Sequence, residues 1–276
     1  MTIYGQNYQL AVTTQGPLYP PAEVMDSEGN FVVVGQILRE TGTHWGKTIV
    51  SSKTPVPPFG QFKPYTIIKE LEGATEQSLE QIVLHTLPLP LPANNYPMLF
   101  APEQCPDATQ AIRNRLPLHE GHIADYRVTD GRRKLPVITL ADWLKASGEL
   151  KVTLSEDKKR VRFEFRFQNL VPHSVYTVMS LRERDLAVNN PSRPGPLGIP
   201  NIIMTDSVGN AEFWAELVDP FPPVSEDSNR IINVVVLFIS GQQSYGGAIG
   251  LHGLGGDVHA HLKLKNPGFS EFTTQA

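Results

Sequence analysis

Residues 160–167, RVRFEFRF, alternate strictly between charged and apolar side chains. A period of two is typical of a β-strand with one buried face, because successive side chains of a strand point to opposite faces. The side chains expected on the buried face are Val161, Phe163, Phe165 and Phe167. The preceding segment GELKVTL is joined to this strand by the charged turn SEDKK, so residues 148–170 predict a β-hairpin.

The rest of the second half continues this pattern of short strands. The segments SVYTVMSL, IINVVVLFI and DVHAHLKLK are each typical of a strand, and NIIMTDSVGNAEFWAEL predicts a second hairpin that turns at DSVGN. Residues 139–148, TLADWLKASG, predict a short helix with Thr139 as its N-cap and Gly148 as its C-terminal stop. Short strands with turns and almost no helix predict a mainly β protein with an antiparallel β-sandwich or jelly roll over residues 139–276.

The first half is rich in proline, as in YPPAEV, KTPVPPFGQFKPY and LPLPLPANNYP. Proline fixes φ and lacks a backbone donor, so these stretches are not expected in interior strands or helices. Residues 1–138 therefore predict an irregular, Pro-rich region of extended segments. Two short helices are expected in it, over about residues 78–86 and from residue 107 to before Pro117. One strand is expected in NFVVVGQIL.

The composition argues against several classes of binding partner and against some cellular locations. The formal net charge of −4, with no run of Lys and Arg, argues against nucleic acid or an anionic membrane as a partner. The single cysteine, Cys105, excludes an intramolecular disulfide and a zinc cluster held by cysteines. The N-terminal segment lacks the features of a secretory signal, and the longest apolar run, VVVLFI, is too short to span a bilayer. We expect a soluble, cytoplasmic protein, with a processed secreted form left open.

A weak resemblance covers residues 140–264. LVPHSVYTVMSL, then PLGIP, then TDSVGNAEF resembles bacterial β-sandwich proteins in which a YT-x-W strand precedes a D-x-x-G-x-A hairpin. Met179 stands where that pattern has tryptophan. The resemblance implies the sandwich fold and no particular activity.

Residues 255–265, GGDVHAHLKLK, contain the candidate site. On a strand, Asp257, His259 and His261 share one face, and side chains two residues apart are about 6–7 Å from one another at the backbone. Two histidines and a carboxylate are a ligand set of non-haem iron, and a third histidine would suit zinc or copper. The metal ligands that the sequence predicts are His259, His261, Asp257, His252 and His173.

The same strand has a second interpretation, in which no metal is bound. Val258, Ala260, Leu262 and Leu264 would pack into the core, and the polar residues between them would face water. A family resemblance does not decide between the two. The spacing G-x5-H-x-H from Gly253 to His261 is similar to the first half of the cupin signature, but Lys265 and Asn266 occupy the positions of its glutamate, so the chain is not a standard cupin.

Three functions follow from these features. The first is a His-ligated metal-binding protein that carries iron, copper or zinc, with an enzyme acting on a small organic molecule as one form of it. The second is a structural or interaction module that assembles into a homo-oligomer through its extended N-terminal half. The third is a metal-free sandwich that binds a small ligand through exposed aromatic side chains, although Trp214 in AEFWAEL is expected to lie in the core or against a partner.

Overall fold

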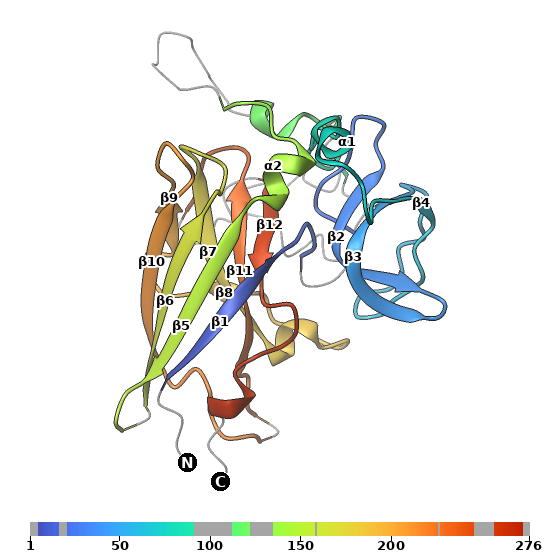
Figure 1. The fold of residues 1–276 in the computed structure, drawn as a ribbon. Helices are drawn as coiled ribbons and strands as arrows, with labels where there is room; N and C mark the ends of the chain where they lie inside the picture. Colours follow the sequence, from blue (N-terminus) through green and yellow to red (C-terminus); the bar gives the residue numbers. More distant parts are fainter. Residues whose placement is uncertain are drawn as a thin grey trace.

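The computed structural model describes residues 5–16, 21–90, 112–121, 135–157, 159–225, 227–245 and 257–272. It is mainly β, as the sequence predicts, and every strand pair in it is antiparallel (Figure 1). The strands are β1 (Gly5–Val12), β2 (Phe31–Arg39), β3 (Gly42–Val50), β4 (Ile67–Glu70), β5 (Ser147–Leu154), β6 (Arg160–Gln168), β7 (Val175–Arg182), β8 (Gly195–Pro196), β9 (Ile202–Met204), β10 (Ala211–Val218), β11 (Ile231–Ile239) and β12 (Val258–Lys263). The α-helices are α1 (Glu76–Glu80) and α2 (Leu140–Leu144), and the 3-10 helices are η2 (Leu118–Glu120), η4 (Glu183–Leu186) and η6 (Ser270–Phe272).

Nine strands form one sheet that curls on itself (Figure 1). Its order is β10-β6-β5-β1-β12-β11-β7-β8, and β9 also pairs with β7. The main core lies inside this curl, where Phe163 and Phe165 of β6 and Val236 and Phe238 of β11 belong to one buried cluster. The strand β1 lies between β12 and β5, so strand pairing crosses the boundary predicted between residues 138 and 139.

A smaller sheet, with the order β2-β3-β4, stands beside the large one (Figure 1). It adds regular structure to the half of the chain predicted to be irregular, and β2 confirms the strand expected in NFVVVGQIL. Val32 and Val34 of β2 belong to the main core, whereas Phe31 and Val33 belong to a second cluster. Both faces of β2 are therefore buried, which explains why its FVVV segment does not alternate with polar residues.

The predicted hairpin of residues 148–170 is confirmed. β5 pairs with β6 along its whole length, and the four alternating apolar side chains of β6 are buried. The helix of residues 139–148 begins as predicted, because the Thr139 hydroxyl accepts the backbone N–H of Asp142. Its predicted end is wrong: Gly148 lies within β5, where an added Cβ would come within 3.0 Å of the Leu262 side chain. The absence of a side chain at Gly148 therefore allows close packing within the sheet, and Gly148 does not end the helix.

Three other predicted elements differ from the structure. The helix expected over residues 78–86 is α1, which starts after its N-cap Thr75 and is shorter. The first part of the helix expected from residue 107, up to residue 111, lies outside the described residues. From residue 112 onward the prediction is wrong, because Arg113 forms a β-bridge with Leu89. The turn at DSVGN is correct, but its two strands are not a paired hairpin. β9 pairs with β7 and β10 pairs with β6, so the turn connects the two ends of the curled sheet.

This turn yields a testable prediction about stability. Gly209 has φ +82°, and an added Cβ would come within 2.0 Å of the Leu170 carbonyl oxygen. We expect Gly209→Ala to lower the free energy of unfolding by about 2 kcal/mol or more, since both backbone strain and a clash are introduced. Gly73→Ala is the matched control, because Gly73 has φ +73° but open space around it. Equal losses for the two variants in urea titrations would contradict the proposed clash.

Candidate functional site

The strand β12 carries the predicted metal ligands, and a β-bulge changes which way they point. Val236 of β11 pairs with Leu262, but the next residue, Leu237, pairs with Ala260, so His261 is an extra residue in the ladder. A bulge shifts the alternation of a strand by one residue. Consequently Val258 and Ala260 join one buried cluster, whereas Leu262 and Leu264 belong to the main core.

Both histidines of β12 are buried. His259 is 2% exposed and His261 is 0% exposed, so the interpretation in which they face water is wrong. The sequence could not reveal this, because the strict alternation from residue 257 to residue 265 gives no sign of the bulge.

His261 is enclosed by aromatic side chains. Its ring stacks on Trp143 with a centroid distance of 3.6 Å and an angle of 17° between the planes. Its Nε2 lies 2.9 Å from the Trp143 carbonyl oxygen and donates to it, which leaves Nδ1 to accept from the Tyr176 hydroxyl at 3.0 Å. Burial lowers the pKa of His261 to about 3, so the imidazole is neutral in the folded protein.

His259 has a similar set of protein partners. Its Nδ1 lies 2.8 Å from the Glu23 carbonyl oxygen and donates to it, and its Nε2 accepts from the Ser240 hydroxyl at 3.0 Å. Burial also lowers the pKa of His259. All four ring nitrogens of the two histidines are therefore engaged by protein groups.

The other predicted ligands are not gathered around this pair. The Asp257 carboxylate forms an ion pair with Arg113. His173 lies before β7, where its backbone N–H donates to the Asp206 carbonyl oxygen, and His252 lies outside the described residues. Among the described residues, no group of three or more His, Cys, Asp or Glu side chains is placed to hold a metal ion. The metal site and its iron, copper or zinc stay a prediction.

Beside the histidines lie two ionisable groups that sequence reasoning missed, the buried Glu23 and the partly buried Lys263. The segment that follows β1 pairs with β12 as far as Thr13, whose backbone N–H donates to the His261 carbonyl oxygen. Further along this segment, the Glu23 carboxylate accepts the backbone N–H of Ala260 at 2.6 Å. The Lys263 ammonium donates to the Gln15 carbonyl oxygen at 3.1 Å. Burial raises the pKa of Glu23 to about 7 and lowers the pKa of Lys263 to about 8. These groups tie β12 to the segment between β1 and β2, and nothing in their sequence neighbourhoods indicates it.

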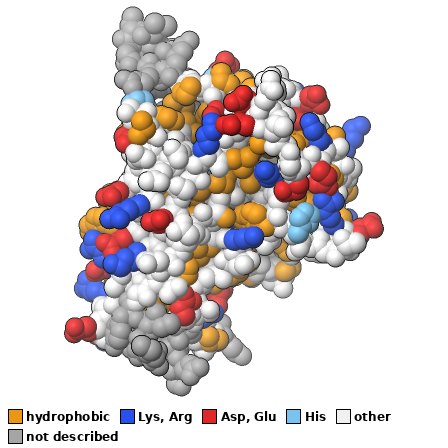
Figure 2. Space-filling view, in the orientation of Figure 1, with side chains coloured by type: hydrophobic (Ala, Val, Ile, Leu, Met, Phe, Trp, Pro, Cys, Tyr) orange, Lys and Arg blue, Asp and Glu red, His pale blue; other side chains and the backbone are white. Residues whose placement is uncertain are grey.

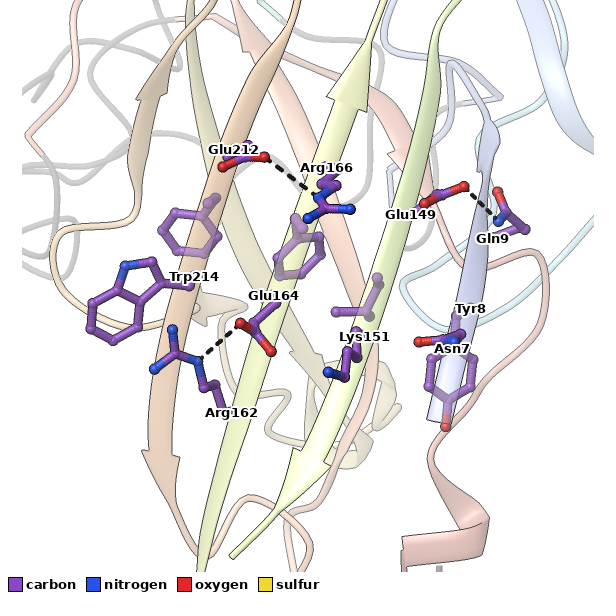
Figure 3. A pocket seen from close by; sticks show the side chains of 13 residues that line it. Asn7, Tyr8, Gln9, Glu149, Lys151, Arg162, Glu164, Arg166, Glu212 and Trp214 are labelled. Carbon is purple, nitrogen blue, oxygen red and sulfur yellow. Dashed lines mark hydrogen bonds and ion pairs between the residues drawn. The ribbon is translucent and has the colours of Figure 1, made fainter. Parts of the chain in front are cut away.

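A surface hollow of about 630 Å³ lies on the outer face of β10, β6, β5 and β1 (Figure 3). Polar side chains project from these strands, and Figure 2 shows positive and negative groups side by side on this part of the surface. The outward-pointing residues that line the hollow are Asn7, Gln9, Glu149, Lys151, Arg162, Glu164, Arg166, Glu212 and Trp214. Their alternation with buried residues on the same strands follows from the period of two.

Trp214 stands at the margin of this hollow (Figure 3). Trp214 is 61% exposed, so the expectation that it lies in the core is wrong, and the alternative that it contacts a partner stays a prediction. The Arg162 guanidinium carbon lies 4.6 Å from the centroid of the Trp214 ring, and Arg162 Nε contacts Glu164 at 3.3 Å. Beyond them Arg166 pairs with Glu212 at 3.5 Å, and the Gln9 amide donates to Glu149 at 3.4 Å. The alternating pattern of β10 could have placed Trp214 on the outer face together with Glu212.

The ion pairs along this face contribute little to stability, because exposed pairs are worth about 0–1 kcal/mol each. These weak ion pairs hold the side chains in place, and a ligand could replace one partner of a pair at little cost in free energy. The hollow is lined by three cationic groups, Lys151, Arg162 and Arg166, and three carboxylates, Glu149, Glu164 and Glu212, so its charges balance.

None of the described helices is long and apolar enough to cross a membrane. Comparison of the chain with protein-family models, with curated proteins and with solved structures gives no match.

Proposed function

We propose that this protein binds a neutral, hydroxyl-rich small molecule, a saccharide, on the outer face of β10, β6, β5 and β1. The observation that carries the proposal is the exposed Trp214 ring beside a hollow lined by planar polar side chains. An exposed tryptophan offers a large apolar surface at a low cost in conformational entropy, and the C–H face of a sugar ring can pack against it. The proposal corresponds to the metal-free ligand-binding function considered from the sequence.

The polar side chains of the hollow match the chemistry of sugar hydroxyls. Carboxylates such as Glu149 accept hydrogen bonds, guanidinium groups such as Arg166 donate them, and the Gln9 amide does both. The balanced charge favours a neutral ligand, since an anion attracted by the cationic groups would be repelled by the carboxylates. Metal binding by His259 and His261 would instead require both imidazoles to give up the hydrogen bonds that keep them buried.

The fold that we propose for this binding protein is a β-sandwich. One layer would be β10, β6, β5 and β1, and the other would be β12, β11 and β7. The shared buried cluster, with Phe165 on one side and Val236 on the other, supports this classification. In it the saccharide face is the outer surface of one layer.

The test is calorimetric titration with maltotriose, cellotriose, xylotriose and triacetylchitotriose, each up to about 10 mM because carbohydrate affinities of this kind are weak. We expect at least one trisaccharide to bind, and Trp214→Ala to weaken that binding by about tenfold or more, since a stacked aromatic surface contributes about 1.4 kcal/mol or more. The free energy of unfolding of Trp214→Ala should differ from that of the parent protein by less than about 0.5 kcal/mol.

The control is Trp45→Ala, which removes a tryptophan of the small sheet that contacts Lys263 and Lys265. It should leave trisaccharide binding unchanged. The proposal is wrong if no trisaccharide binds, or if Trp214→Ala binds as tightly as the parent protein.

A further inference from the structure

A second hollow adjoins the first at Trp214. It has a volume of about 550 Å³ and lies between β9 and β10. The residues that line it are Gly198, Ile199, Pro200, Ile202, Ile203, Met204, Glu212, Phe213, Trp214, Ala215 and Glu216. Glu212, Phe213 and Trp214 line both hollows, so the two adjoin each other at β10. We call the second hollow the apolar slot.

The apolar slot follows from the way the sheet ends. The turn of residues 205–210 joins β9 to β10, but β9 pairs with β7 and β10 pairs with β6. The two strands therefore diverge from the turn without forming a ladder, and a wedge opens between them. Ile199 is 78% exposed and Met204 is 67% exposed on its walls. A patch of exposed apolar side chains of this kind is a candidate binding surface.

An added β-strand is not the occupant that the structure favours. Strand addition needs a free edge along β10. Gly198 lies against the Ala215 side chain in the middle of β10, because an added Cβ at residue 198 would come within 2.7 Å of the Ala215 Cβ and 3.7 Å of its Cα. The loop that contains Gly198 thus stands beside β10 at Ala215 and restricts the approach of an added strand there. The space that remains suits a narrow apolar group that lies along the walls.

We infer that the ligand is an amphipathic glycoside, whose sugar lies on the polar face and whose alkyl or acyl chain extends past Trp214 into the apolar slot. This inference rests on the proposed saccharide site and adds the class of ligand. Two observations support it: the polar hollow and the apolar slot share Trp214, and the side chains that line them differ in kind. Charged and amide side chains line most of the polar hollow, whereas, among the described residues, Glu212 and Glu216 are the only charged ones that line the apolar slot. A sugar alone would leave Ile199 and Met204 in water, whereas an attached chain would cover them.

The experiment measures the affinity of methyl, butyl and hexyl β-D-glucopyranoside, each kept below the concentration at which it forms micelles. We expect the dissociation constant to fall about fourfold for each added methylene, because each one transfers apolar surface from water into the slot. Met204→Asp should abolish this dependence on chain length and leave the affinity for methyl glucopyranoside unchanged. Trp214→Ala should weaken binding of all three compounds.

The matched control is Val208→Asp. Val208 is also exposed, at 61%, but it lies on the turn and does not line the slot. This variant should keep the full dependence on chain length. Its result distinguishes an effect of Met204→Asp on the slot from an unspecific effect of a surface charge.

The outcomes separate the two proposals. Equal affinities for the three glucosides, or a chain-length dependence that survives Met204→Asp, would overturn the apolar slot as a binding site and leave the saccharide site standing. Binding of a trisaccharide with no binding of any alkyl glucoside would also overturn the inference. If neither trisaccharides nor glucosides bind, the proposed function itself is wrong.

Discussion

Replacing Trp143 with alanine is expected to lower the free energy of unfolding by about 3–5 kcal/mol. Trp143 of α2 is fully buried, and its ring stacks on His261 and meets the Phe238 ring edge-on at 6.0 Å. Its indole N–H also donates to the Thr13 carbonyl oxygen at 2.9 Å. The variant would lose the burial of a large side chain, leave a cavity and leave a buried carbonyl without its donor.

The measurement is chemical unfolding of the parent protein and of Trp143→Ala, with Trp214→Ala as the control for an exposed tryptophan. The control should lose less than about 0.5 kcal/mol, because Trp214 is mostly in water. Similar losses for the two variants would contradict the placement of α2 and β12 around one core.

The second large effect concerns the pH dependence of stability. The folded protein holds the Glu23 proton more tightly than the unfolded chain does, because burial raises the pKa of Glu23 from 4.5 to about 7. The stability that this group contributes is therefore complete below pH 4.5 and is lost as the pH rises through 7. The difference in unfolding free energy between the parent protein and Glu23→Gln should fall by about 3 kcal/mol across this range.

Comparing the two proteins isolates Glu23 from the histidines. Because burial lowers the pKa of His261 from 6.5 to about 3, its contribution has the opposite sign and is lost as the pH falls from 6.5 toward 3. That contribution is present in both proteins and cancels in the difference. Glu40→Gln, at an exposed position, measures the part of the slope that the loss of any carboxylate would produce. A difference between the parent protein and Glu23→Gln that stays constant from pH 4.5 to 7 would contradict the buried state of Glu23.

The elements that the sequence predicts well are those fixed by local pattern. The alternation of residues 160–167 is enough to define β6, and Thr139 followed by Asp142 is enough to begin α2. The second predicted hairpin failed for a reason that lies elsewhere in the chain. Local residues determine the turn at Gly209, but the choice of partner for β9 depends on β7, about 30 residues earlier.

The predicted site shows the same limit. The pattern of Asp257, His259 and His261 correctly indicates a strand, but their surroundings come from distant segments. His261 meets Trp143, and His259 meets Glu23, a residue from the opposite end of the chain. Burial of polar groups depends on such long-range partners, which periodicity does not encode. The exposed Trp214 was in principle predictable, since it alternates with buried Phe213 and Ala215.

The most direct test of the saccharide site uses the indole N–H signals of the protein, of which there are three, from Trp45, Trp143 and Trp214. Each is assigned with a Trp→Phe variant in ¹⁵N-labelled protein and followed while the trisaccharide that binds in calorimetry is added. Binding on the outer face of β10 predicts that the Trp214 signal shifts along a saturating curve while the signals of Trp45 and buried Trp143 stay in place. A Trp214 signal that does not move while the trisaccharide binds, or a shift confined to Trp45 or Trp143, would contradict the account.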